Sequence, residues 1–240
     1  MKSTLALALL LAVAASSYAQ TPEERAAARD VVARRSDAVV LVLATIKTRM
    51  NIGGRESTRD QPMLANATVL DGSGLTVMAL SMLEPGEIAN RSIGSGAMST
   101  EATDLRMRLA DGQEVPAKIV LRDPDLDLVF VKPVEPPAAP LPSVDAPPGT
   151  PAVLDLLVAL QRTGEATGWR TLATFTYVQM TVERPRTYHA LSSTPGLGAP
   201  VFDTRGRFVG VIVRVGGSRT SPLPAVLPAE DIREVAKQAK

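Results

Sequence analysis

The sequence is most informative in what it lacks. It contains no cysteine, which excludes disulfide bonds and catalytic thiolates. It has one histidine, His189, which excludes a metal site built from several imidazoles, and we expect neither a metal nor another cofactor. Aromatic residues make up only 3% of the chain, so the core must consist mainly of Val, Leu, Ile and Ala. The formal net charge of +1 gives no electrostatic reason to bind nucleic acid or an anionic membrane.

The first 19 residues have the features of a secretory signal peptide. Lys2 precedes an apolar run from Leu5 to Ala15, and Ser17 and Ala19 suit a peptidase site that is cleaved after Ala19. The run is shorter than the about 20 residues with which a helix spans a bilayer. We therefore predict a periplasmic or secreted mature protein, from residue 20 to 240, without a stable membrane span. The alternative is that the segment is retained as an anchor.

Between two helical ends, the chain reads as a series of short strands. Thr21, Pro22 and Glu24 form a capping-box pattern with proline in the first turn, which predicts a helix over residues 21–35. Residues 229–239 predict a second helix. About a dozen β-rich segments lie between them, among them residues 38–46, 66–70 and 208–215, and turn signals such as DGSG, ADGQ and TRGR separate them. This spacing is typical of an all-β barrel or sandwich protein.

A proline-rich connector divides the β-rich region into two units. It covers about residues 133–150, and proline lacks the backbone donor that a central strand requires. We place the first β unit at about residues 37–133 and the second at about residues 150–228. Both belong to one predicted domain, residues 20–240.

Five segments that follow one another in the chain carry a resemblance to a known family. They are DVVARRSDAVVLVLAT, ATVLDGSGLTVMALSMLEPG, LRMRLADGQEVPAKIVLRDPDLDLVFVK, TPGLGAPVFDTRGRFVGVIV and AVLPAEDIREV. Over about residues 30–238 they resemble trypsin-like serine proteases of the HtrA (high-temperature-requirement) type. The resemblance implies an all-β fold of two six-stranded antiparallel β-barrels with an N-terminal and a C-terminal helix. We expect no PDZ module of the kind often appended in that family.

The resemblance also locates the family's catalytic positions, and most of them carry unsuitable residues. The histidine position falls on Ser81, the aspartate position on Asp127 and the serine position on Leu197. A serine hydroxyl is not a base near neutral pH, and leucine has no nucleophilic atom. Pro195 stands where a glycine N–H would help to form the oxyanion hole, and proline has no N–H. The resemblance therefore implies a vestigial site in an inactive homologue, a pseudoprotease.

A binding role would use the cleft between the barrels, where an extended peptide adds to a strand edge in active relatives. We expect the partner to be an unfolded or extended peptide or another envelope protein, including an active protease homologue that this chain would regulate. The residues expected to line the cleft are Gly196, Leu197, Gly198, Val211, Ile212, Val213 and Arg214.

Two other functions stay open from the residues alone. An active serine endopeptidase would need an unorthodox site that uses Ser81, Ser192 or Ser193. His189 is close to the last two in sequence, but the resemblance places it far from Ser81, and we interpret it as a partly exposed strand residue. The third hypothesis is a structural envelope domain without a peptide cleft.

Two acidic patterns have plain structural interpretations. Asp127 can hydrogen-bond to backbone at the start of a strand, whether or not it is a catalytic vestige. The DPD sequence at residues 123–125 lacks the glycine and the distal glutamate of an EF-hand loop, so it predicts a turn rather than a calcium site.

Overall fold

The computed structural model of the protein describes residues 20–52, 55–86, 98–145, 147–216 and 223–239. The predicted signal peptide, residues 1–19, lies outside this part of the chain. Within the described ranges, no helix is both long enough and apolar enough to cross a membrane.

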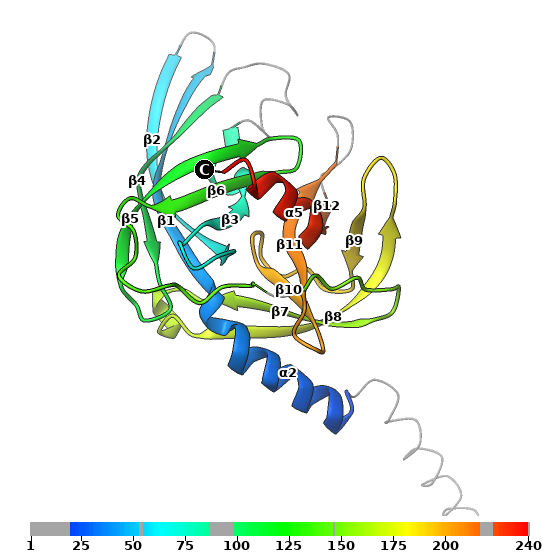
Figure 1. The fold of residues 1–240 in the computed structure, drawn as a ribbon. Coiled ribbons are helices and arrows are strands. Elements are labelled where there is room, and N and C mark those ends of the chain that lie inside the picture. Colours follow the sequence, from blue (N-terminus) through cyan, green and yellow to red (C-terminus); the bar gives the residue numbers. More distant parts are fainter. Residues whose placement is uncertain (1–19, 53–54, 87–97, 146, 217–222, 240) are drawn as a thin grey trace, which may run out of the picture.

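The chain begins its described part with helix α2, Pro22–Arg35, which confirms the predicted helix. The Thr21 hydroxyl accepts a hydrogen bond from the Glu24 N–H at 3.1 Å, and the Glu24 carboxylate accepts one from the Thr21 N–H at 2.7 Å. Only Ala28 and Val31 of the helix are buried. Its first turns therefore extend away from the barrels, while its last turns pack against them (Figure 1).

The first barrel is a closed antiparallel sheet with the strand order β1-β2-β3-β6-β5-β4. A short 3₁₀ turn, Ser36–Ala38, leads from α2 into it, and a one-turn helix, α3 (Leu80–Leu83), follows β3. Its strands are β1 (Val39–Ile52), β2 (Arg55–Val69), β3 (Thr76–Ala79), β4 (Met98–Arg108), β5 (Glu114–Asp123) and β6 (Leu128–Pro133).

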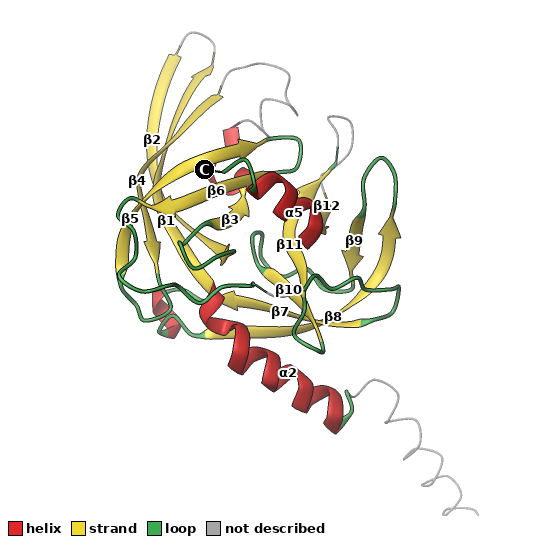
Figure 2. Cartoon of the chain, viewed as in Figure 1, coloured by secondary structure: helices red, strands yellow, loops and turns green. Residues whose placement is uncertain are grey.

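The second barrel is also closed, with the order β10-β11-β12-β9-β8-β7. A 3₁₀ turn, Glu165–Thr167, lies between β7 and β8, and helix α5, Ala229–Ala236, follows the last strand. The prediction of two six-stranded antiparallel barrels with a helix at each end is confirmed (Figure 2). The strands are β7 (Leu156–Arg162), β8 (Thr171–Val182), β9 (Tyr188–Leu191), β10 (Pro200–Asp203), β11 (Phe208–Val215) and β12 (Leu223–Pro228).

The two barrels share one buried cluster in addition to the core that each encloses. Phe130 of β6 belongs to the same cluster as Phe202 of β10 and Phe208 of β11, and Val31 of α2 and Ile232 of α5 complete it. The Phe202 and Phe208 rings lie 6.0 Å apart between centroids, which suits a tilted aromatic pair. The remaining core is mainly aliphatic, as the composition predicted. Burial between the barrels therefore fixes their relative position.

The structure corrects the predicted lengths of the first strands. The sequence indicated strands at residues 38–46 and 66–70, but β1 and β2 continue beyond the barrel and pair from Lys47↔Asp60 to Asn51↔Glu56. β4 extends the sheet along β1, where Lys47 pairs with Glu101. We call residues 47–51, 56–60 and 99–101 the ribbon. None of these residues is buried, so the ribbon projects from the barrel without a core of its own (Figure 1).

Candidate functional site

Asp127 lies at the start of β6, directly before Leu128, and its position is set by an unusual backbone conformation. Its φ of 56° is in the left-handed region, which aspartate adopts more readily than most side chains. Its carbonyl accepts a hydrogen bond from the Leu80 N–H at 3.0 Å. In the preceding turn the Asp123 carboxylate accepts bonds from the Asp125 and Leu126 N–H groups, so DPD forms the predicted turn.

The Asp127 carboxylate accepts three hydrogen bonds, and one of them joins the two barrels. Ser81, in α3, donates its N–H to Oδ1 at 2.7 Å and its hydroxyl to Oδ2 at 3.1 Å. Arg214, in β11 of the second barrel, donates its backbone N–H to Oδ2 at 2.7 Å. The interpretation that Asp127 binds backbone is confirmed by two of these bonds, and the third comes from the Ser81 side chain.

The electrostatics around Asp127 favour a structural carboxyl group rather than a base aimed at a substrate. Burial raises the pKa of Asp127 above its ordinary value of 3.8, although the Arg214 and Ser81 hydrogen bonds act in the opposite direction. Ser81 is only 8% exposed, and its hydroxyl proton is directed at Asp127. The pair therefore has neither an imidazole nor an accessible hydroxyl with which to begin acyl transfer.

The turn that carries Leu197 offers no nucleophile. Pro195 is buried, whereas Gly196 and Leu197 are half-buried, and the Leu197 side chain packs against the core of the second barrel. The Gly198 N–H donates to the Ile212 carbonyl at 2.7 Å, which fastens the turn to β11. Apolar and glycine residues thus form the part of the turn that an active site would use.

Strand β11 contributes fewer accessible groups than the sequence predicted. The side chains of Val211, Ile212 and Val213 are 0–1% exposed and belong to the core. The backbone of Ile212 is bonded to the Leu197 turn, because its N–H donates to the Ala199 carbonyl at 3.1 Å. Among the predicted β11 residues, only Arg214 is exposed.

The free edge of β11 begins at Arg214. In an antiparallel strand the N–H and C=O of one residue point to the same side, and those of the residue two positions along do so as well. Because the Arg214 N–H points to Asp127, its carbonyl faces the same side, away from β12. Within the described residues no hydrogen bond is made to this carbonyl, so at Arg214 strand β11 presents a backbone acceptor on the side away from β12.

His189 and the two serines near it in sequence do not form a catalytic group. His189 pairs with Val226 of β12 and Thr181 of β8, and its Nδ1 lies 3.0 Å from the Thr181 hydroxyl oxygen. It is only 6% exposed, so the prediction of a partly exposed residue is wrong, because its neighbours on both sides cover it. Burial lowers the pKa of His189 below 6.5.

The two serines are bonded to β8 instead of to His189. The Ser192 hydroxyl accepts a hydrogen bond from the Tyr177 N–H, and the Ser193 hydroxyl donates one to the Phe175 carbonyl.

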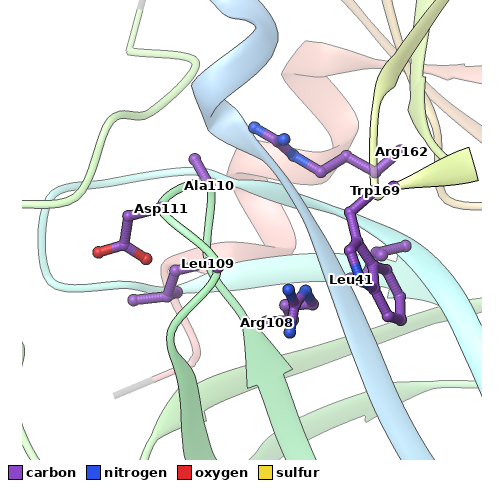
Figure 3. A pocket seen from close by; sticks show the side chains of 9 residues that line it. Leu41, Arg108, Leu109, Ala110, Asp111, Arg162 and Trp169 are labelled. Atoms are coloured by element: carbon purple, nitrogen blue, oxygen red, sulfur yellow. The ribbon is translucent and has the colours of Figure 1, made fainter. Parts of the chain in front are cut away.

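A pocket between the barrels was missed by the sequence reasoning. It has a volume of about 200 Å³ and combines Leu41 of β1, the β4–β5 turn and the β7–β8 loop (Figure 3). Three segments far apart in the chain form it, so no local motif marks it. The one available signal was Trp169, the only tryptophan, which stands in a polar, glycine-containing loop.

The comparisons with known proteins agree with this architecture. A family model described as a trypsin-like peptidase domain matches residues 59–211, which is more than half of the chain. The chain belongs to the trypsin-like peptidase domain family. The sequence of this trypsin-like domain matches none of the curated proteins.

Two solved structures of the HtrA-type protease AlgW resemble this trypsin-like domain. The structure with a tripeptide has a TM-score of 0.56 at 17% identity, and the structure with a decapeptide has a TM-score of 0.61 at 15% identity. Each alignment covers 88% of this chain, but only 62% and 65% of the AlgW chains. The likeness confirms the expected HtrA-type fold of two barrels.

Proposed function

We propose that this trypsin-like domain is an exported pseudoprotease that binds an extended peptide in its cleft without cleaving it. The observation that carries the proposal is the contact between Asp127 and Ser81. In a serine protease the corresponding carboxylate orients an imidazole, whereas this one is satisfied by a serine hydroxyl and two backbone N–H groups. The predicted signal peptide supports export.

Inactivity follows from three separate losses. Ser81 supplies no base, Leu197 supplies no nucleophile, and Pro195 supplies no N–H to an oxyanion. Because these groups perform different steps of acyl transfer, replacing any one of them does not restore the others. The alternative of an active endopeptidase has no support around Ser192 and Ser193, since both hydroxyls are bonded to β8.

The binding role is supported by the backbone carbonyl of Arg214, which faces away from β12. Asp127 holds the Arg214 N–H at 2.7 Å, which keeps this end of β11 extended beside the Leu197 turn. A peptide can pair with the Arg214 carbonyl through a main-chain hydrogen bond. The AlgW structures were solved with peptides, which is consistent with an extended peptide as the partner class.

The test of inactivity compares the mature chain, residues 20–240, with a variant that restores the missing groups. Neither cleavage of unfolded casein nor labelling by a fluorophosphonate probe is expected from the natural chain. The triple variant Ser81→His, Pro195→Gly, Leu197→Ser should gain labelling, and adding Asp127→Asn to it should abolish most of that gain. Casein cleavage by the natural chain that a serine-protease inhibitor blocks would overturn the proposal.

The test of binding uses a fluorescent unfolded-casein peptide and the same peptide with methylated backbone nitrogens. Strand addition requires the peptide N–H groups, so the methylated peptide should bind much more weakly in fluorescence anisotropy. Hydrogen exchange at residues 214–216 should slow when the unmodified peptide is present. Equal binding of both peptides would exclude pairing with this edge.

A further inference from the structure

The pocket between the barrels shares none of the residues that were predicted to line the peptide cleft. It is lined by Leu41, Arg108, Leu109, Ala110, Asp111, Gly112, Arg162, Gly168 and Trp169. Its volume of about 200 Å³ is smaller than the roughly 300–1,000 Å³ of drug-sized ligand sites. Any occupant must therefore be compact.

The backbone of the loop that carries Trp169 has an energetically unfavourable left-handed conformation at this residue. Gly168 has φ 68° and Trp169 has φ 60°, so two consecutive residues are left-handed, and a bulky side chain rarely adopts this region. The Trp169 N–H donates to the Gly164 carbonyl at 3.2 Å, and the Thr163 N–H donates to the Arg170 carbonyl at 2.9 Å. These bonds fix the indole at the pocket wall. Backbone strain of this kind is concentrated at functional sites.

Arg108 combines a fixed orientation with unused donors. Its guanidinium carbon lies 4.3 Å from the centre of the Trp169 ring, which is a cation–π contact. Its Nη1 donates to Glu114 at 3.1 Å. A guanidinium has five N–H donors, and within the described residues this is the only hydrogen bond that the Arg108 side chain makes. Several of its N–H groups therefore remain available in the pocket.

Arg162 supplies a second, more deeply placed cation. Its side chain is only 11% exposed. Its Nε donates to the Val39 carbonyl at 2.6 Å and its Nη2 to the Ser36 carbonyl at 3.2 Å, while Asp37 lies 3.4 Å from Nη2. In the described part of the chain its Nη1 forms no hydrogen bond, so the two N–H groups of Nη1 are unused, whereas Nε is bonded to Val39 and Nη2 to Ser36 and Asp37.

Apart from Asp111, the other side chains that line the pocket are apolar. Leu41, Leu109 and Ala110 supply aliphatic surface, and the Trp169 indole forms a flat wall (Figure 3). The carboxylate of Asp111 accepts a hydrogen bond from the Gln113 N–H at 2.9 Å, so one of its oxygens is bonded within the turn. Planar guanidinium groups match carboxylates with two parallel hydrogen bonds. We propose that this pocket binds a carboxylate carried on a compact apolar group, which is the chemistry of an apolar C-terminal residue or of a small free acid.

The only tryptophan of the protein lies in the pocket wall, so its fluorescence reports occupancy directly. The probes are N-acetylleucine, its neutral amide, and a hexapeptide that ends in leucine with a free or an amidated C-terminus. N-acetylleucine should change the Trp169 emission, and the amide should bind about tenfold more weakly or worse, because it loses the charge-assisted bonds. Tighter binding of the free-acid peptide identifies a chain terminus as the source; binding of N-acetylleucine alone identifies a small acid.

Two arginines on β4 provide a matched pair of variants. Arg108→Gln should weaken N-acetylleucine binding about tenfold or more in fluorescence and in isothermal titration calorimetry. Arg106→Gln removes a charge that also pairs with Glu114, at 2.7 Å, but that does not line the pocket, and its binding should match the natural chain. Urea unfolding of both variants checks that the fold is retained.

Each of the following results would overturn the inference. They are binding of the amide as tight as that of the acid, equal losses from Arg108→Gln and Arg106→Gln, and no heat or fluorescence change with any carboxylate probe. Inorganic phosphate that competes as well as N-acetylleucine would also reject the assigned ligand class.

Discussion

Gly198 in the second barrel lies directly against the backbone carbonyl of Asn66 in the first. A Cβ atom at Gly198 would be 2.1 Å from the Asn66 oxygen, and the φ of Gly198 is 79°. The Thr68 hydroxyl donates to the Gly198 carbonyl at 3.2 Å, which adds a bond at the same contact. The turn that carries Leu197 is therefore positioned by the first barrel as well as by β11.

Replacing Gly198 with alanine should strongly destabilise the protein. The left-handed conformation and the collision with backbone together predict a loss of about 3 kcal/mol or more in the free energy of unfolding. Gly168→Ala is the matched control, because its φ is 68° but no atom lies within 4 Å of the added Cβ. The control should lose only about 1 kcal/mol. Urea unfolding measures both, and equal losses would show that the contact with Asn66 does not matter.

The raised pKa of Asp127 predicts how its contribution to stability depends on pH. Folding favours the protonated carboxyl, so this contribution is greatest below 3.8 and is lost as the pH rises above 3.8 through the raised pKa. Asp127→Asn removes the titration. The difference in unfolding free energy between the natural chain and Asp127→Asn should therefore be most favourable to the natural chain in acid and should decrease with rising pH. A difference that increases with pH would contradict the assignment.

The lowered pKa of His189 makes the opposite prediction. Folding favours the neutral imidazole, so the contribution of His189 is fully present above 6.5 and is lost as the pH falls through its lowered pKa. As the only histidine, His189 gives a single set of imidazole NMR signals whose titration midpoint should lie below 6.5. The lowered midpoint should persist in Thr181→Val, because burial is its cause. A midpoint at or above 6.5 would show that the ring is solvated.

Arg162 should contribute to stability chiefly through the carbonyls that it binds. Arg162→Met leaves the Val39 and Ser36 carbonyls without this donor and should cost about 2 kcal/mol of unfolding free energy. Lys237→Met is a suitable comparison, because Lys237 and its partner Glu234 are each 71% exposed. That variant should change stability by less than about 0.5 kcal/mol. A similar effect of the two substitutions would argue against a buried role for Arg162.

The strands of the barrels could be predicted because their apolar residues are buried together. FVGVIVRV is β11, Phe208–Val215, as the sequence indicated, and six of its eight residues are buried. The ribbon was missed because its residues are polar and face solvent on both sides, a pattern that local reasoning assigns to a loop. The backbone pairing between its strands stabilises the ribbon, and this pairing produces no apolar pattern in the sequence.

The candidate site could be only partly predicted. Ser81 and Asp127 are 46 residues apart, and only the family resemblance suggested that they meet; the structure places them in hydrogen-bonding contact. The burial of His189 depends on neighbours in β8 and β12, so a short strand gives no sign of it. The pocket depends on Arg108 and Trp169 meeting across the boundary between the barrels, which no spacing in the sequence encodes.

Strand β1 passes without interruption from a buried barrel into the exposed ribbon. Val40 and Val42 are 0–1% exposed, whereas Arg49 and Asn51 are open to solvent. Opening the ribbon exposes no core, while opening the barrel end of the same strand requires the whole barrel to separate. The two ends of one continuous strand therefore open with different free energies. The amide protons of the ribbon end should exchange rapidly, and those of the barrel end should be protected until global unfolding.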